Sequence, residues 1–309
     1  MNEGYEKRRV LCLAGPTGAG KTALAIRLAN TLGCEIVNAD SRQVYEDFPI
    51  ITAQPDATEK AQAPHHLYGF LATDRAIDVQ TWMDMALRKV DEILEKGRIP
   101  LLVGGTGMYF ERLLHGIADI PAVDQSIHME LEAMVEKKGA PALHAMLEER
   151  DPVLFARLHP NDKQRIVRGL EVAMGTGHPL TWWQQNAHKE PSCEGPLLVV
   201  NTRLSELEPR LLARMDKMLA MGALDEARKA YALCQDAKAP GWSGIGCREL
   251  YAHLSGSLDL SEARDLWLKN TRAYAKRQIT WFRGRNEAIW LGADDLEAAL
   301  RAWGDFCAQ

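Results

Sequence analysis

The sequence predicts an α/β fold in which a parallel sheet carries a mostly helical insertion domain. Two observations predict the sheet: a short apolar strand runs through a glycine-rich loop into a helix, and further buried strands alternate with helices. A third observation predicts the insertion, because one long internal stretch has several helical patterns and no convincing strand. The chain has 309 residues, of which 46% are hydrophobic, enough for one large domain or two modest ones.

The first elements form a strand, a loop and a helix, followed by a second strand. Residues 9–14 (RVLCLA) are an apolar run that ends in the glycine-rich loop, and residues 21–32 have helical spacing. Residues 34–40 (CEIVNAD) are predicted to be a second buried strand, which ends in Asp40.

A helix and a third strand follow an irregular stretch. Residues 41–77 are rich in turn formers, and residues 78–96 are predicted to form an amphipathic helix with Asp78 as its cap and Gly97 as its stop. The apolar run at 99–105 (IPLLVGG) is the third buried strand. Alternating strands and helices indicate a parallel sheet, in which ligands bind at the carboxyl ends of the strands.

The second half of the chain is mostly helical. Residues 118–190 are expected to be helical, as is most of 205–285, whereas 197–204 and 288–291 are predicted to be strands that return to the sheet. We therefore assign residues 1–117 and 191–309 to a catalytic core with a basic helical C-terminal region, and residues 118–190 to the insertion.

The bulk composition is that of an average soluble globular protein. Charged residues make up 26% of the chain, and no apolar run approaches the roughly 18 residues needed to cross a bilayer. The start of the chain lacks an apolar signal core, and the six cysteines form no C-x-x-C pair. We expect a cytoplasmic protein without a membrane partner. Its oligomeric state cannot be deduced from these features, and a monomer is the simplest expectation.

One segment departs from the formal net charge of −5, which by itself argues weakly against a nucleic-acid partner. Residues 266–285 contain six basic residues and no acidic one. Such a run can be a solvated helix face, or it can contact nucleic acid. The aromatic residues between the basic ones favour the second interpretation. They are Trp267, Tyr274, Trp281 and Phe282.

The glycine-rich loop fits the pattern G-x-x-x-x-G-K-[ST] in full. Its glycines let successive N–H groups point at phosphate oxygens, and the helix that follows offers its positive end. Lys21 adds a point charge, and Thr22 offers a hydroxyl group to Mg²⁺. The motif predicts a P-loop NTPase-like core that binds a diphosphate. The loop residues are Gly15, Pro16, Thr17, Gly18, Ala19, Gly20, Lys21 and Thr22.

Two further strand ends are expected beside the loop. Asp40 can hold Mg²⁺ through water or accept a proton from a nucleophile, although an aspartate after a strand is often only a cap or turn residue. Thr106 lies between two glycines, which suggests either close approach of the backbone to a ligand or a tight turn.

The third strand ends without the acidic residue of a motor-type ATPase, but a small-molecule kinase stays possible. For the adjacent His65 and His66, packing or hydrogen bonding is favoured over a metal pair.

Several motifs in this order closely resemble those of the bacterial tRNA dimethylallyltransferase (tRNA isopentenyltransferase) family. After GPTGAGKTALA come NADSRQVY, APHHL, GRIPLLVGGTGMYF, HPNDKQRIVRGLEV and TRAYAKRQITWFRGR. The resemblance covers about residues 10–291. It implies transfer of a dimethylallyl group from dimethylallyl diphosphate to the exocyclic N6 amine of the adenine 3′ of the anticodon, in tRNAs that read codons beginning with U. The phosphate loop would then hold a leaving diphosphate.

The resemblance also implies roles for individual residues. Asp40 would accept the proton of the amine, Thr106 would contact the substrate near the reacting centre, and Arg214 would be a further ligand of the diphosphate. Mg²⁺ would bind at Thr22. The residues expected to contact tRNA are Asp40, Ser41, Arg42, Gln43, Thr106, His128, Gln164, Arg165, Ile166, Val167, Arg168, Gly246 and Arg248.

Three departures from the family pattern affect RNA contacts rather than the reaction. Gln54 stands in a segment where the family usually has GTAKP, and Cys247 stands where a tyrosine is common. His128 replaces a frequent arginine.

Three alternatives compete with the family's function: a small-molecule kinase, an enzyme that prenylates free adenine nucleotides, and a nucleotide-gated RNA-binding module without catalysis.

Overall fold

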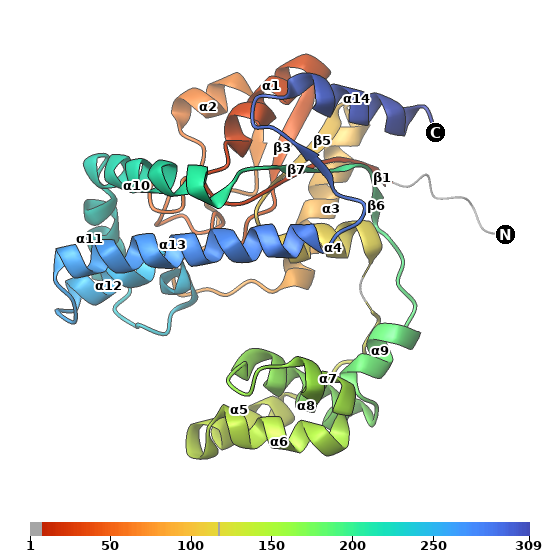
Figure 1. Cartoon of the computed structure of the whole chain (residues 1–309), viewed down its shortest axis with the longest axis vertical. Helices are drawn as coiled ribbons and strands as arrows, with labels where there is room; N and C mark the ends of the chain where they lie inside the picture. The colour runs from red at the N-terminus through yellow and green to blue at the C-terminus, as the bar shows by residue number, and fades with distance from the viewer. Residues whose placement is uncertain (1–7, 117) are drawn as a thin grey trace. The chain divides into compact units, whose positions relative to one another are not determined.

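The computed structural model describes residues 8–116 and 118–309. The chain divides into two compact units, of which the first comprises Met1–Leu114 and Ser192–Gln309 and the second comprises His115–Pro191. We call them the core unit and the helical unit and describe each by itself (Figure 1).

The core unit contains a parallel sheet of six strands, which confirms the predicted α/β class. The strand order is β4-β3-β5-β2-β7-β8, so the strand that leads into the phosphate loop lies inside the sheet. Two short strands pair beside it in parallel, β1 (Arg8–Arg9) with β6 (Cys193–Glu194). The six sheet strands are β2 (Leu11–Ala14), β3 (Cys34–Asn38), β4 (His65–His66), β5 (Ile99–Gly104), β7 (Leu197–Val200) and β8 (Ile289–Leu291).

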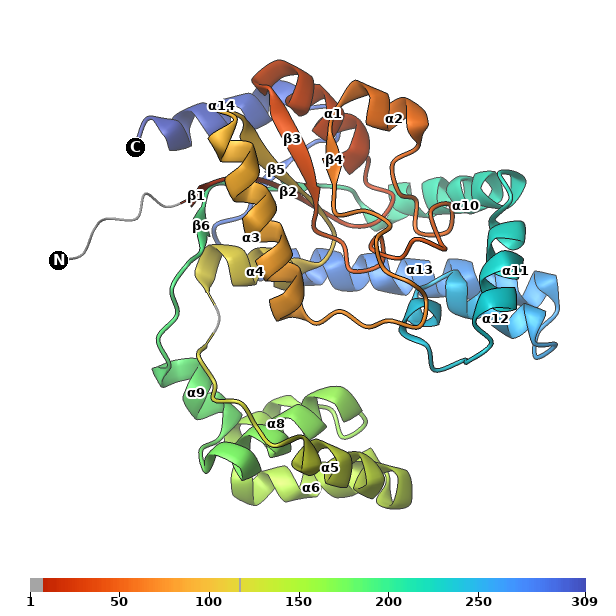
Figure 2. The same ribbon diagram turned by 180° about the vertical axis from the view of Figure 1, so that it is seen from behind.

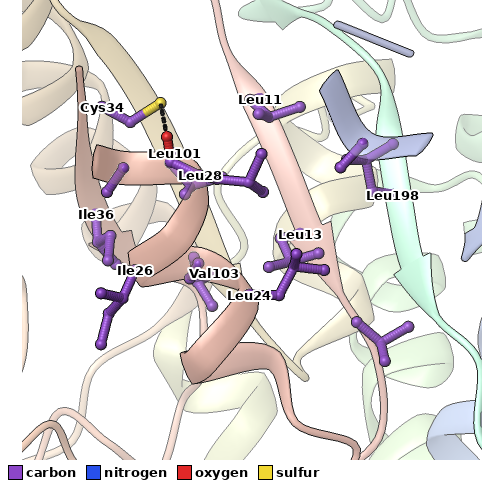
Figure 3. Close-up of a cluster of buried hydrophobic side chains, with 14 of the residues drawn as sticks. Leu11, Leu13, Leu24, Ile26, Leu28, Cys34, Ile36, Leu101, Val103 and Leu198 are labelled. Carbon is purple, nitrogen blue, oxygen red and sulfur yellow. Dashed lines mark hydrogen bonds between the residues drawn. The ribbon is translucent and has the colours of Figure 1, made fainter. Parts of the chain in front are cut away.

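Helices cover both faces of this sheet (Figures 1 and 2). On one face, α1 (Lys21–Leu32) packs beside α14 (Leu296–Cys307), and on the other α3 (Val79–Glu95) contacts β3 and β5. Alternate strand residues point towards α1, so that Leu11 and Leu13 share one apolar cluster with Leu24 and Leu28 (Figure 3). This buried cluster fixes the loop between β2 and α1 at both ends.

Four of the remaining helices of the core unit, α10 to α13, share a second apolar cluster. α13 contacts both α10 and α12, and the large side chains of Phe48, Trp242 and Trp267 are buried in this cluster. The helices are α2 (Ala57–Gln62), α4 (Gly107–His115), α10 (Leu204–Ala220), α11 (Ala223–Leu233), α12 (Cys247–Leu254) and α13 (Leu260–Arg283), with a short 3₁₀ turn η1 (Pro240–Ser243).

Two stretches differ from the sequence prediction. The predicted strand at 197–204 ends at Val200, because α10 begins at Leu204. The stretch 41–77 is not wholly irregular, since it contains α2 and the short strand β4. These two elements are too short to show a periodicity. The helix α2 is fixed instead by a capping box of Asp56 and Glu59.

The helical unit contains five helices and no strand among its described residues, 115–116 and 118–191, as the sequence predicts. Its apolar centre includes Leu131, Leu143, Leu147, Ile166 and Leu170. The helices are α5 (Gln125–Lys138), α6 (Ala140–Arg150), α7 (Pro152–Arg157), α8 (Lys163–Thr176) and α9 (Leu180–Asn186).

Within 8–116 and 118–309, we find no helix that combines the length and the apolar character needed to span a membrane. All six cysteines are free thiols.

Candidate active site

The site lies where three neighbouring strands of the sheet end. The phosphate loop follows β2, Asp40 follows β3 after one further residue, and Thr106 follows β5 in the same way. After β2 the chain continues to strands on one side of it and later returns to β7 on the other side. In open α/β sheets this switch point is where ligands bind.

The phosphate loop is closed around its own lysine. The Lys21 Nζ donates to the carbonyl oxygens of Gly15 and Pro16, each at 2.9 Å. Gly18 has a φ of 78°, and a Cβ there would lie 2.7 Å from the Leu211 side chain of α10. At its N-terminus α1 has no side-chain cap, because Gly20 occupies that position. Its first N–H groups therefore form an anion-binding end.

A cavity of about 400 Å³ opens over this loop, a size typical of small-molecule sites. Lys21, Thr22, Asp40 and Arg214 all line it. Burial lowers the pKa of Lys21 to about 8, with Arg214 adding to the shift and Asp40 opposing it. Burial also lowers the pKa of Arg214. Two desolvated cations beside an anion-binding helix end favour a ligand with several negative charges.

A second cavity of about 320 Å³ adjoins the first. Both are lined by Thr17, Asp40, Thr52 and Arg214, so these residues stand at the junction. The second cavity differs in character, because its walls combine apolar, aromatic and basic side chains. They include Ser41, Arg42, Leu211, Met215, Met218, Ile245, Trp267, Thr271, Tyr274 and Arg277.

Asp40 is oriented by a buried asparagine that the sequence analysis did not identify. Asn38 is 0% exposed, its Oδ1 accepts from the Asp40 N–H at 2.9 Å, and its Nδ2 donates to the carbonyls of Asp40 and Leu67 at 3.0 Å each. The Asp40 Oδ1 in turn accepts from the Arg42 N–H at 2.9 Å. The sequence offered one signal for Asn38, which is a polar amide at the end of an apolar strand. A buried amide must be hydrogen-bonded, so such a residue is expected to hold neighbouring groups in place.

Thr106 is tied to the same turn. Its N–H donates to the Ala39 carbonyl at 3.2 Å, and its Oγ1 accepts from the Ser41 N–H at 3.0 Å. Tyr274 hydrogen-bonds to Thr106, and burial, together with the nearby Asp40, raises the pKa of that tyrosine. The structure thus brings Asp40, Ser41 and Thr106 together, as the strand ends predicted.

The glycines that flank Thr106 have a different purpose from the predicted close approach of a ligand. A Cβ on Gly105 would lie 2.1 Å from the Gln278 Nε2, and a Cβ on Gly107 would lie 2.3 Å from the Trp281 ring. These glycines therefore make room for two side chains of α13. The correction could not come from the local sequence, because α13 begins more than a hundred residues later.

The residues after Asp40 are partly occupied by structural contacts. The Arg42 Nη1 donates to the Ser243 Oγ at 2.5 Å, at the wall of the second cavity. The Gln43 Nε2 donates to the carbonyls of Thr52 and Ala53 at 3.0 and 2.7 Å, and it thereby holds Ala53 at a φ of 53°. The Gln43 amide nitrogen thus fixes the loop that lines both cavities.

Three residues expected to contact RNA are buried. In the helical unit, Ile166 is 0% and Val167 is 3% exposed, since both belong to its apolar centre. Gly246 of the core unit is packed so tightly that a Cβ would lie 2.6 Å from both Ile51 and Trp267. These three positions pack within their own unit, and the contact to RNA that the resemblance implies for them stays a prediction.

The other expected RNA contacts have accessible side chains. Gln164, Arg165 and Arg168 are exposed on α8, as is His128 on α5. The Arg168 Nη1 lies 3.2 Å from the Glu171 Oε2, and the His128 Nδ1 lies 3.9 Å from the same oxygen. Arg248 of the core unit is also exposed, on α12.

The basic segment 266–285 has two kinds of aromatic side chain. Trp267 and Phe282 are buried in the core unit, and Trp267 and Tyr274 both line the second cavity. The Arg285 guanidinium lies over the Trp281 ring, 4.2 Å from its centroid. Five of the six basic residues of this segment are exposed, whereas none of its four aromatic residues is.

The departures from the family pattern are structurally accommodated. The Gln54 Nε2 donates to the Tyr45 carbonyl at 2.7 Å, and Cys247 is buried at the start of α12.

The two adjacent histidines are used in hydrogen bonds. The His65 Nδ1 bonds to the Ala63 carbonyl and the His66 Nε2 to the Glu35 carboxylate. Among the described residues, no cluster of three or more histidine, cysteine or acidic side chains could hold a metal ion.

The donor set of the first cavity does fit Mg²⁺. Thr22 and Asp40 both line the cavity over the phosphate loop, where the hydroxyl would bind the ion directly and the carboxylate through water. Mg²⁺ is commonly bound by one or two protein oxygens, with water and substrate phosphates completing its shell. A site with few protein ligands therefore suits this ion when a phosphate substrate is present.

The sheet order, the phosphate loop at its central strand and the anion-binding cavity above define a protein of the P-loop class. The second cavity, with Asp40 at the junction, adds room for an acceptor beside the phosphate loop. This pairing is that of a group-transfer enzyme rather than of a simple nucleotide-binding module.

Comparison with known proteins specifies the family. The model of the IPP transferase family matches residues 43–285. A tRNA dimethylallyltransferase of Desulfovibrio desulfuricans is 56% identical over 295 residues, 96% of this chain and 91% of that protein. One of Nitratidesulfovibrio vulgaris (strain Miyazaki F) is 53% identical over 94% of this chain and 90% of that protein. The chain belongs to the IPP transferase family.

Two solved structures resemble this one over nearly its full length. The tRNA isopentenylpyrophosphate transferase of Bacillus halodurans has a TM-score of 0.69 at 34% identity and covers 98% of this chain and 96% of its own. A eukaryotic dimethylallyltransferase acting on tRNA has a TM-score of 0.79 at 27% identity and covers 97% of this chain and 77% of its own.

Proposed function

We propose that this protein transfers a dimethylallyl group from dimethylallyl diphosphate to the N6 amine of the adenine 3′ of the anticodon, in tRNAs that read codons beginning with U. The observation that carries the proposal is the junction of the two cavities. Asp40 and Arg214 line both the cavity over the phosphate loop and the cavity with apolar and basic walls. A diphosphate and an acceptor base can thus meet at one carboxylate.

The chemistry of the residues supports this reaction. The bond between the allylic carbon and its diphosphate oxygen breaks, and negative charge grows on the diphosphate. Lys21, Arg214 and the N–H groups of the phosphate loop would stabilise that charge. A bond forms between the carbon and the adenine nitrogen, and Asp40 would take the proton that the nitrogen loses.

Mg²⁺ is the proposed cofactor, held by the Thr22 hydroxyl and, through water, by Asp40. When bound, it would neutralise part of the charge that develops on the leaving diphosphate.

The acceptor is proposed to be RNA because of two basic surfaces. Segment 266–285 has six basic residues without an acidic one, and Arg277 of this segment lines the second cavity. In the helical unit, Arg165 and Arg168 are exposed on α8. An adenine stacked in an anticodon loop cannot reach Asp40, so the base would leave the stack and enter the second cavity.

The alternatives explain fewer features. A small-molecule kinase accounts for the phosphate loop but not for the second cavity and the basic segment. An enzyme acting on free adenine nucleotides has no use for the exposed arginines of the helical unit. We further propose that the protein is a monomer. A cytoplasmic location would agree with the six free cysteines, because thiols stay reduced there.

A transfer assay tests the proposal. Purified protein with Mg²⁺, dimethylallyl diphosphate and unmodified tRNA should add one prenyl group to the adenine that follows the anticodon, as detected by mass spectrometry of nuclease digests. A tRNA with guanine at that position is the matched control and should remain unmodified. Prenylation of adenosine monophosphate but not of tRNA would favour the free-nucleotide enzyme, and formation of ADP from ATP with a small acceptor would favour the kinase.

A further inference from the structure

One buried amide joins two loops of the site. Gln278 lies on α13 and is 5% exposed. Its Oε1 accepts from the Thr17 N–H of the phosphate loop at 2.9 Å, and its Nε2 donates to the Gly105 carbonyl at 2.9 Å. The amide therefore uses both its acceptor and its donor on backbone groups 261 and 173 residues away in sequence.

The fit between Gln278 and these loops is tight. A Cβ on Gly105 would lie 2.1 Å from the Gln278 Nε2 and 3.3 Å from the Gly15 carbonyl oxygen. The phosphate loop, the end of β5 and α13 thus meet at one point with no room for a further methyl group. A substituent this close must displace the amide, because backbone on the other side cannot move aside.

The two loops that Gln278 joins carry the two halves of the proposed reaction. Thr17 lines both cavities. Gly105 directly precedes Thr106, whose hydroxyl accepts from the Ser41 N–H beside Asp40. A shift of one loop against the other would move the diphosphate relative to Asp40, and misplacement of reacting groups by about 1 Å can reduce a rate 10²-fold.

We propose that Gln278 is a positioning residue that sets the distance between the phosphate loop and the Asp40–Thr106 turn. The inference rests on the proposed function, because it assigns the two loops to the two substrates. Gln278 touches neither reacting group, so its loss should reduce turnover more than it weakens either substrate's binding.

Two variants test this role. Gln278→Met keeps the length of the side chain and removes both hydrogen bonds, and we expect kcat to fall at least about tenfold while KM for tRNA changes less than about threefold. Gln278→Glu keeps the acceptor for Thr17 but loses the donor for Gly105 until the carboxyl group is protonated. Its turnover relative to the unaltered protein, measured at each pH, should therefore rise as the pH falls.

The controls separate positioning from stability. Gln62→Met changes an exposed glutamine of α2 that lines neither cavity and should leave kcat unchanged. Thermal unfolding of each variant shows whether it is folded at the assay temperature. The proposal would be overturned if folded Gln278→Met kept an unchanged kcat. It would also be overturned if the loss in kcat/KM of this variant came entirely from a higher KM. If Gln278→Met does not fold, the Gln278→Glu variant decides. The proposal is then overturned if the turnover of Gln278→Glu relative to the unaltered protein does not change with pH.

The outcome is distinguishable from failure of the proposed function. If the unaltered protein does not prenylate tRNA, the proposed function fails. The role of Gln278 is then decided by amide hydrogen exchange, where faster exchange of the Thr17 N–H in Gln278→Met supports a hold on the phosphate loop. Unchanged exchange at Thr17 would contradict it.

Discussion

At the scale of single residues, the site depends on a carboxylate that is held by backbone and amide groups. Asn38 fixes the peptide of Asp40 from both sides, and the Arg42 N–H fixes one carboxylate oxygen. Asp40 itself lines both cavities and so stands at their junction. A base in this position needs a fixed orientation, because proton transfer requires hydrogen-bond contact with the acceptor nitrogen.

Replacement of Asp40 should abolish most of the activity without unfolding the protein. We expect Asp40→Ala to lower turnover by at least about 10²-fold, the lower end of general-base effects. Asp40→Asn is the sharper variant, since its amide oxygen can still accept from Arg42 but cannot take a proton. Single-turnover prenyl transfer measures the effect, and circular dichroism checks the fold. Near-normal turnover of Asp40→Asn would remove Asp40 from this role.

Lys21 should make diphosphate binding depend on pH. Burial lowers its pKa to about 8, so the free protein loses this positive charge as the pH rises through that value. A bound diphosphate stabilises the charged form and raises the pKa again. Binding should therefore weaken above about pH 8 and be accompanied by proton uptake.

Calorimetry in buffers of different ionisation enthalpy measures this uptake. Inorganic diphosphate has its own titration, so Lys21→Met is the reference from which the lysine contribution is taken. Identical proton uptake by both proteins near pH 8 would show that Lys21 does not titrate in this range.

At the scale of elements, buried side chains join helices that are separate in sequence. Asp151 is buried at the N-terminus of α7, where its carboxylate accepts from the Leu154 N–H at 3.0 Å. It also accepts from the Thr181 Oγ1 at 2.6 Å and the Thr181 N–H at 3.0 Å, at the start of α9. One carboxylate thus satisfies three donors and ties two short helices together.

Asp151→Ala should destabilise the helical unit. Three donors lose their acceptor, and an unsatisfied buried polar group costs about 1–3 kcal/mol. With partial access of water to the space left behind, we expect a loss of at least about 2 kcal/mol, measured as faster amide hydrogen exchange in α7 and α9. Glu148→Ala, which changes an exposed carboxylate of α6, is the control. A loss below about 0.5 kcal/mol would contradict the proposed tie.

Local signals predicted the elements, whereas contacts across the chain could not be predicted. The helix expected at 21–32 is observed as Lys21–Leu32, and Gly20 and Gly33 at its ends have positive φ. The phosphate loop was readable because its chemistry lies within eight consecutive residues. Gln278 was not recognised, because its partners Thr17 and Gly105 are far away in sequence.

The same limit explains why the burial of three expected RNA contacts was not predicted. Ile166 and Val167 stand in a motif next to exposed Arg165 and Arg168, and the motif alone does not separate the faces of the helix. The helical period gives the separation once the apolar centre of the unit is known. Gly246 is similar, since only the positions of Ile51 and Trp267 reveal why it must lack a side chain.

At the scale of the whole molecule, the chain separates two tasks. All residues that line the two cavities belong to the core unit, whereas the exposed arginines of α8 belong to the helical unit. Substitutions of these exposed arginines should therefore alter RNA binding alone. Protein contacts to phosphates act electrostatically and release counterions, so their loss has a recognisable salt dependence.

Arg165→Ala should weaken tRNA binding without changing the affinity for inorganic diphosphate. If Arg165 contacts one phosphate, the slope of log affinity against log salt concentration should decrease by about 0.7–0.9. Filter binding over a range of salt concentrations gives this slope. Lys137→Ala, at an exposed position of α5, serves as the comparison. An unchanged slope would exclude Arg165 from the RNA interface.

The central claim is that the phosphate loop holds a leaving group and that no phosphate is transferred. The direct measurement is the stoichiometry of inorganic diphosphate released against prenyl groups gained by tRNA, in the presence and absence of ATP. We predict one diphosphate for each prenyl group, with no requirement for ATP and no hydrolysis of it. Prenylation that requires ATP hydrolysis, or a phosphorylated product, would contradict the claim.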